Sequence, residues 1–524
     1  MKPQSEVPPL IEVMTSTTDK LTRGSLLARN TIWNLIGQVA PLVVAIFAIP
    51  LLIKGLGMDR FGVLTLAWVV IGYFSLFDLG LGRALTQLVA NKLGAGQESE
   101  IPALAWTGLI LMLIMGLVGT LVVCLLSPWL IQDALKIPKN LHPEVLNAFY
   151  LLAVSIPVVT NTAGLRGLLE AYQRFDFTNL VRIPMGIFTF LGPLLVLPFS
   201  HSILPVVAIL VIGRLIAWVV HLFLCFNVLP DMSHGILLQL KLIRQLLIFG
   251  SWMTVTNIVG PLMVYFDRFL IGGLLSVAAV AYYATPYEVV TKLLIIPGAL
   301  VGVLFPAFSS NFVQDRRHTV LLFGRGVKYT FLSLFPVSLI IITLASEGLD
   351  LWLGADFAKN STRVLQLLTM GVFINSLAQV AFALIQGARR PDLTAKLHLI
   401  ELPFYLLTVW WLIDAYGIEG AAIAWVARIG VDTIIMFGMA QRFFPIKALV
   451  IWRMVLAMGV ALIILSLACL QASLVMKGFF LLLTLSAFVF AAWFLILAPD
   501  ERVMIGNRLK TIQLHNSCNS NKNE

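Results

Sequence analysis

Stretches of about 20 apolar residues recur through this chain from near Asn30 to Leu497, and short polar segments separate them. A helix of about 20 residues crosses roughly 30 Å of hydrocarbon, and it satisfies its own backbone hydrogen bonds there. The chain is therefore expected to be an all-α polytopic membrane protein. We place about fourteen transmembrane helices, near 30–53, 61–84, 101–127, 145–166, 179–198, 203–227, 245–266, 279–310, 320–345, 364–386, 395–413, 418–440, 450–470 and 475–497. The eighth stretch holds Pro286, Pro297 and Pro306, which predict a kink.

The distribution of the basic residues supports this number of spans and indicates the orientation of the chain in the membrane. Only 12% of the 524 residues are charged, against about 25% in a soluble protein. With a cytoplasmic amino terminus, 25 of the 36 Lys and Arg residues lie in cytoplasmic segments and 8 lie outside. This bias is the positive-inside rule, and it accounts for the net charge of +10 without a nucleic-acid partner. We expect a multi-pass protein of a bacterial inner membrane with both termini in the cytoplasm.

A short sequence in the first half of the chain recurs in the second half. Residues 168–178 (LLEAYQRFDFT) return as 384–394 (LIQGARRPDLT), and an Ala-Ile pair five residues before Arg214 returns five residues before Arg428. Two related halves in a membrane chain are typical of an alternating-access transporter. We expect a cytoplasmic segment (1–29), a six-helix bundle (30–228), a cytoplasmic linker (229–244), a second six-helix bundle (245–441), two extra helices (446–498) and a cytoplasmic tail (499–524). The linker is expected to contain a short amphipathic helix.

Several function classes find no support in the sequence. The four cysteines are scattered and show neither a disulfide framework nor metal-ligand spacing. We find no catalytic triad, metal motif or nucleotide-binding fold, so neither an enzyme nor a cofactor is expected. The outside segments are too short to form a catalytic domain, which argues against a saccharide polymerase.

Several motifs in their order resemble one transporter superfamily. They are RNTIWN from Arg29, FDLGLG from Phe77, the element from Gly167 to Asp176, Asp267-Arg268, and LFPAFS from Leu304. With these motifs, the chain resembles the polysaccharide branch of the multidrug/oligosaccharidyl-lipid/polysaccharide exporter superfamily over most of residues 25–445. The resemblance implies a MATE-like fold and flipping of polyprenyl-pyrophosphate-linked oligosaccharide for cell-surface polysaccharide such as O-antigen. A lipid II-type flippase and a drug or metabolite antiporter of the same superfamily stay open as alternatives.

Three cations lie within predicted spans, where each costs about 2.5–3.5 kcal/mol unless it faces a partner or a cavity. Lys292 lies four residues after Glu288 and Arg428 four before Asp432, so each can form a pair on one helical face. Arg214 has no carboxylate at the corresponding spacings. We expect Arg214 and Arg428, at matching repeat positions, to present cations to a central cavity that binds a lipid pyrophosphate. Lys292 is a further candidate for this cavity.

Further charged residues fit either a site or a structural role. Arg268 is a further candidate for the cavity, whereas Asp267 could anchor a helix boundary or couple an ion. Glu401 could couple protons with His398 or bond a neighbouring helix. Asp78 could couple an ion or pair with a charge, although the Gly-rich helix end at which it lies favours a packing role. Beyond the lipid-linked substrate and membrane lipids, we expect a polysaccharide polymerase and a chain-length regulator as partners.

Overall fold

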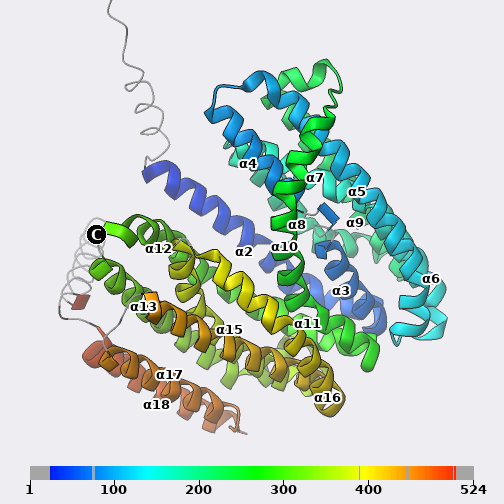
Figure 1. The fold of residues 1–524 in the computed structure, drawn as a ribbon. Helices are drawn as coiled ribbons and strands as arrows, with labels where there is room; N and C mark the ends of the chain where they lie inside the picture. Colours follow the sequence, from blue (N-terminus) through cyan, green and yellow to red (C-terminus); the bar gives the residue numbers. More distant parts are fainter. Residues whose placement is uncertain are drawn as a thin grey trace, which may run out of the picture. The chain divides into compact units, whose positions relative to one another are not determined.

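The computed structural model describes residues 24–502 apart from 74–76, 79, 315, 389, 444–447, 472, 498 and 500. Its described residues are mostly helical, as expected, and form no strand (Figure 1). Each of the fourteen predicted spans falls on helical structure, and ten helical runs are long and apolar enough to cross a membrane. The predicted amino-terminal segment and tail lie largely outside the described residues.

The chain divides into two compact units, 1–284 and 285–524. The helices of unit 1 are α2 (Gly24–Leu56), α3 (Met58–Tyr73), α4 (Leu81–Gly94), α5 (Ile101–Trp129), α6 (His142–Val154), α7 (Ile156–Ala171), α8 (Phe175–Val196), α9 (Ile203–Val228), α10 (Leu240–Leu274) and the first part of α11 (Val277–Val290). Unit 2 holds α12 (Ile295–Gln314), α13 (Arg316–Thr343), α14 (Ala345–Leu353), α15 (Ala355–Gly387), α16 (Pro391–Phe443), α17 (Ala448–Ala468) and α18 (Leu474–Ala491).

Helix α10 belongs to unit 1, although the sequence repeat assigns residues 245–284 to the second bundle. It packs against α3, α4 and α5. The backbone N–H of Lys136 donates to Gly272 O at 2.9 Å, and Lys136 Nζ donates to Leu274 O at 2.5 Å. A cation on the carbonyls of a helix carboxyl end is favourable. These contacts hold the end of α10 within unit 1.

The linker 229–244 does not form the expected amphipathic helix. Pro230–His234 is a single 3₁₀ turn, and an extended segment follows from Gly235 until α10 begins at Leu240. Gly235 has a φ of 151°, a conformation that ends regular helix. Ile236, Leu237 and Leu238 are exposed there without helical periodicity.

The second predicted span is broken into α3 and α4. Gly80 precedes α4 with a φ of 73°, a left-handed conformation that glycine adopts without steric cost. Its N–H donates to Asp78 Oδ1 at 2.7 Å, and Asp78 is buried. Asp78 therefore bonds the backbone at the turn that starts α4, rather than pairing with a basic side chain.

The proline-rich eighth span is also interrupted, as the prolines predicted. A 3₁₀ turn, Thr291–Leu294, separates α11 from α12. In a continuous α-helix the ring of Pro297 would clash with the carbonyl of Leu293, and it could not donate a hydrogen bond to it. The tighter turn avoids this clash.

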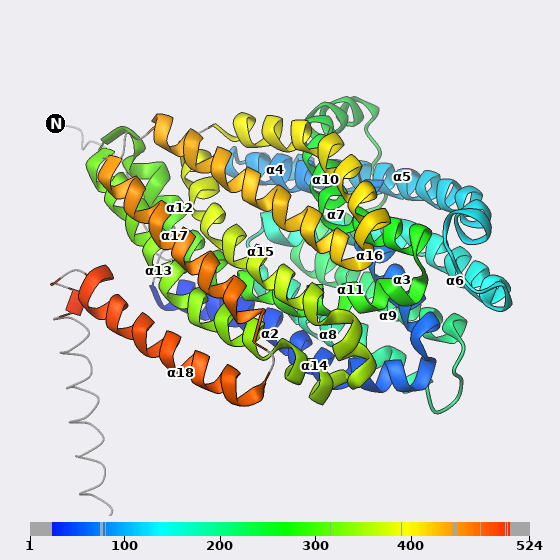
Figure 2. The same ribbon diagram turned by 90° about the horizontal axis from the view of Figure 1, so that it is seen from below.

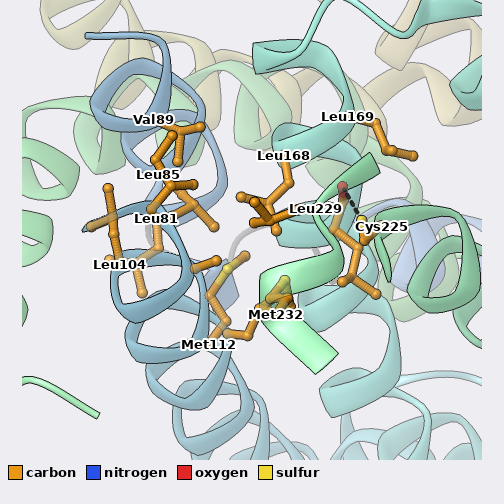
Figure 3. Packing of buried hydrophobic residues seen from close by; sticks show 14 of the residues in the cluster. Leu81, Leu85, Val89, Leu104, Met112, Leu168, Leu169, Cys225, Leu229 and Met232 are labelled. Atoms are coloured by element: carbon orange, nitrogen blue, oxygen red, sulfur yellow. Dashed lines mark hydrogen bonds between the residues drawn. The ribbon is translucent and has the colours of Figure 1, made fainter. Parts of the chain in front are cut away.

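Each unit has its own apolar core. The core of unit 1 joins α4, α5, α7 and α9, and it includes Leu85, Leu104, Met112 and Leu168 (Figure 3). Cys225 Sγ donates to Leu165 O at 3.3 Å beside it. The core of unit 2 joins α12, α13, α15, α16 and α17. Each unit therefore buries apolar residues of its own helices.

Two ion pairs attach the last helix of unit 2. Lys477 at the start of α18 is 6% exposed, and its Nζ lies 2.9 Å from both carboxylate oxygens of Glu347 on α14. Beyond the other end, Glu501 accepts from Lys328 Nζ and from Tyr329 on α13, each at 2.6 Å. Helix α18 is thus fixed at both ends, while it and α17 pack beside α13 (Figure 2).

Candidate functional site

The repeated sequence builds the same side-chain pair in both units. Nε and Nη2 of Arg174 donate to the two oxygens of Asp176 at 3.0 and 2.9 Å. The same atoms of Arg390 donate to Asp392 at 2.9 and 3.2 Å. These hydrogen bonds and the opposite charge raise the pKa of Arg174 and of Arg390 above its ordinary value. Both pairs are exposed and lie within one turn, so we interpret them as structural.

Arg214 on α9 is a partly buried cation with no acidic partner. Its Nη1 donates to Leu210 O of its own helix at 3.2 Å. Within the part of the chain that the structure describes, no carboxylate oxygen lies within 4.0 Å of its guanidinium. No other helix there supplies the acid that α9 itself lacks, and the guanidinium keeps donors for an anion.

Helix α9 carries further polar groups on the same face as Arg214. Trp218 Nε1 donates to Asn161 Oδ1 at 3.0 Å, and Asn161 Nδ2 donates to Leu109 O at 2.9 Å. His221 Nδ1 lies 2.8 Å from Ala217 O. The bonds of Trp218 and Asn161 link α9 to α7 and α7 to α5, and they hold the helix that carries Arg214.

Unit 2 assembles a buried charge cluster on α16. The backbone of α16 reverses at Gly417, which has a φ of 62° and a ψ of −141°, so α16 is two helices folded back on each other. Arg428 Nη1 lies 3.9 Å from Glu401 Oε2, and His398 Nε2 lies 3.7 Å from Asp432 Oδ1. We call these four residues the α16 cluster. The expected pair of Arg428 with Asp432 is replaced by these two contacts across the reversal.

Three members of the α16 cluster could ligate a metal. One ligand atom each from His398, Glu401 and Asp432 lies within 4.8 Å of the others. Arg428 nevertheless places a positive charge beside Glu401, which opposes a second cation. We therefore interpret the arrangement as a charge-paired cluster rather than a metal site.

Asp267 and Arg268 are both fully buried at the end of α10. Tyr283 of α11 donates its hydroxyl to Asp267 Oδ2 at 2.6 Å. The guanidinium carbon of Arg268 lies 4.8 Å from the ring centre of Tyr265. With an exposure of 0%, Arg268 does not reach a water-accessible surface in this structure. Asp267 thus links α10 to the first part of α11.

Lys292 and Glu288 form the i,i+4 contact that their spacing predicts, with Nζ and Oε2 3.6 Å apart. Both side chains are more than 40% exposed. The interaction of such an exposed pair is weak.

The contacts across the reversal of α16 were missed in the sequence. Glu401 lies sixteen residues before Gly417 and Asp432 fifteen residues after it. A close antiparallel turn at Gly417 would have placed them side by side. Gly420 supports such a turn, because a Cβ there would lie 1.8 Å from Leu412 O. Tyr405, whose ring centre lies 5.3 Å from the guanidinium carbon of Arg428, was missed as well.

Comparison with known proteins gives the chain a family. The polysaccharide biosynthesis protein family matches residues 27–312. A candidate O-antigen transporter of Shigella flexneri is 30% identical over 78% of this chain and 96% of its own length.

Solved structures share the fold at low identity. A lipid II flippase in an inward closed conformation matches with a TM-score of 0.65 and 13% identity, over 88% of this chain and 99% of its own. An inward-facing multidrug resistance transporter of the MATE family matches with a TM-score of 0.64 and 14% identity, over 78% and 98%. The fold is thus that of the superfamily to which the sequence motifs pointed. On its sequence, this chain belongs to the polysaccharide biosynthesis protein family.

Proposed function

We propose that this protein is a flippase. It moves a polyprenyl-pyrophosphate-linked oligosaccharide from the cytoplasmic to the outer leaflet of the inner membrane, for the synthesis of cell-surface polysaccharide. A pyrophosphate and a glycan cannot cross hydrocarbon unaided, because each unsatisfied polar group costs several kcal/mol there. The function needs cationic groups within the membrane part of the protein and no bond-making chemistry.

The observation that carries the proposal is Arg214. A guanidinium within a membrane-spanning helix, without an acid in the described part of the chain, needs an anion or water to offset its burial. Arginine binds two oxygens of a phosphate with its planar fork. Arg428 is the repeat counterpart of Arg214, and the exposed Lys292 adds a third cation. We propose that these three residues contact the lipid pyrophosphate along the translocation path.

Family and fold support transport rather than catalysis. The candidate O-antigen transporter of Shigella flexneri matches over almost its whole length, which favours a lipid-linked saccharide over a drug as the substrate. The cationic residues within spans also disfavour cationic drugs. In the proposed cycle both termini stay in the cytoplasm, and a polymerase and a chain-length regulator receive the flipped unit.

Deletion of the gene tests the function. Surface polysaccharide should fall, while the lipid-linked unit accumulates on the cytoplasmic face of the membrane, because its glycan and pyrophosphate cannot cross. Extraction of lipid-linked intermediates, with a membrane-impermeant glycosidase to report their leaflet, gives the measurement. Normal surface glycan in a strain without a second flippase, or accumulation in the outer leaflet, would reject the proposal.

A further inference from the structure

The two carboxylates of the α16 cluster are buried but loosely bonded, while His398 and Arg428 are partly exposed. Glu401 is 8% exposed and Asp432 6%. Their contacts of 3.9 Å to Arg428 and 3.7 Å to His398 are longer than hydrogen bonds. Among the described residues neither oxygen of Glu401 makes a hydrogen bond, and neither does Arg428 Nε. Buried polar groups are normally satisfied, so the cluster keeps bonding capacity for an occupant.

The charges of the α16 cluster do not cancel on their own. Two carboxylates face one guanidinium and one imidazole, so the sum is −1 when His398 is neutral. A net charge inside the membrane is costly. One additional proton makes the cluster neutral.

The surroundings of Glu401 offer no other ionisable partner among the described residues. The charged or titratable groups near it are His398, Arg428, Asp432 and the phenol of Tyr405, all on α16. Helix α15, which packs against α16, contributes Phe382, whose ring stacks on His398 at 6.5 Å between centres. If an anion draws the guanidinium of Arg428 away, the loss of its positive charge is therefore felt mainly by the carboxylate of Glu401.

We propose that Arg428 is shared between Glu401 and the anionic group of the substrate, so that binding of the anion is linked to uptake of one proton by Glu401. This inference rests on the proposed function. The guanidinium stays charged throughout. When a phosphate oxygen of the substrate replaces the carboxylate of Glu401 beside Arg428, Glu401 loses its cationic partner. Glu401 then takes a proton from water. Linkage is reciprocal, so protonation of Glu401 releases Arg428 for the anion.

Sulfate is a suitable probe, because it presents the tetrahedral oxygens of a phosphate and does not itself titrate near neutral pH. We would add sulfate to the purified full-length protein in a weakly buffered solution with a pH indicator, and measure binding and proton uptake together. Sulfate binding that is present in the unsubstituted protein and absent from the Arg428→Met variant is assigned to the site at Arg428. Up to one proton should enter per sulfate bound there, and affinity should tighten by at most about tenfold per pH unit as pH falls.

Glu401→Gln separates linkage from binding. This variant should bind sulfate with an affinity almost independent of pH and take up no proton. The matched control is Glu419→Gln, which changes an exposed acid on the same folded-back helix pair and should behave as the unsubstituted protein. The pH dependence of sulfate affinity in the unsubstituted protein gives a second test that needs no variant.

The outcomes distinguish the two proposals. Proton uptake that persists in Glu401→Gln, or Arg428-dependent binding without uptake, overturns the linkage and leaves the proposed function intact. Absence of Arg428-dependent binding overturns the linkage too. Normal surface glycan after deletion of the gene rejects the proposed function itself.

Discussion

Single intramembrane arginines divide into two kinds in this protein. Arg428 lies 3.9 Å from the carboxylate of Glu401, whereas Arg214 donates only to a carbonyl of its own helix among the described residues. An arginine next to an acid has its charge partly offset before any substrate arrives. An arginine without one is ready for an external anion, and Arg214 is therefore the residue at which substitution should act most directly on the substrate.

Replacing Arg214 should impair export more when the charge is lost than when only the planar guanidinium fork is lost. Arg214→Ala should lower export about tenfold or more, since a hydrogen bond to a charged group contributes about 1.5–3 kcal/mol. Arg214→Lys should retain part of the activity, because its ammonium still attracts phosphate but lacks the planar fork. Surface glycan in complemented deletion cells gives the measurement, at matched protein levels.

Arg166→Ala serves as the control. Arg166 is an exposed arginine of the same unit, paired with Glu170 in the next turn, and its loss should leave export near normal. Export by Arg214→Ala and Arg214→Lys equal to that of the unsubstituted protein would exclude Arg214 from the path.

The sequence predicted contacts along one helix better than contacts between helices. The isolation of Arg214 and the pairing of Lys292 with Glu288 follow from spacing along one helix, and both agree with the structure. The partner of Arg428 could not be found in this way. It lies on the other side of a chain reversal, and spacing along one helix says nothing about contacts between two.

Helices of this protein depart from the expected spans where glycine or proline permits it. The break before α4 occurs at Gly80 and the 3₁₀ turn before Pro297. The existence of each span followed from hydropathy, which counts apolar residues. The breaks depend on single φ angles and missing N–H groups, which hydropathy does not register.

The attachment of α18 should depend on pH. Burial would raise the pKa of the Glu347 carboxyl, but hydrogen bonds from Lys477, together with its charge, lower that pKa below its ordinary value. A carboxylate with a depressed pKa stabilises the fold above its unfolded pKa and ceases to do so as pH falls through the folded one. The stabilising effect should be full above about pH 4.5, the ordinary pKa of Glu, and vanish in stronger acid.

Thermal unfolding of the detergent-solubilised protein checks this expectation. Glu347→Gln should lower the Tm near neutral pH, and the difference from the unsubstituted protein should shrink as the pH is lowered below about 4.5. Asp350→Asn changes an exposed acid on the same helix α14 and should have little effect. A Tm difference for Glu347→Gln that is constant with pH would mean that the ion pair does not hold α18.

At the scale of the whole molecule, the duplication is visible in backbone bonds as well as in sequence. The N–H of Arg174 donates to Leu169 O, and the N–H of Arg390 donates to Ile385 O, each five residues back. Both units therefore leave one helix and enter the next by the same turn. The division of the chain after residue 284 could not be predicted from the repeat, because it depends on the packing of α10 against α3, α4 and α5.

The expected topology has its own test. Reporter fusions should place the ends of the chain and the loop that follows α4 in the cytoplasm, and residues 346–361 outside, since the Lys and Arg residues are concentrated in the segments assigned to the cytoplasm. A fluorescent protein that matures only in the cytoplasm, and a phosphatase active only outside it, report opposite sides. A cytoplasmic signal from 346–361 would contradict the count of spans that precede it.

The reversal of α16 at Gly417 bears on how the chain is made. Its two arms leave the ribosome in succession with almost no connecting loop, so they can enter the bilayer as one helical hairpin. Arg428 then meets Glu401 within that hairpin, and its insertion cost of about 2.5–3.5 kcal/mol is offset without waiting for any other helix. Arg214 has no such companion on α8 or α9 among the described residues. During biogenesis, the second half of the duplication inserts its arginine already neutralised, and the first half must insert its own as a lone charge.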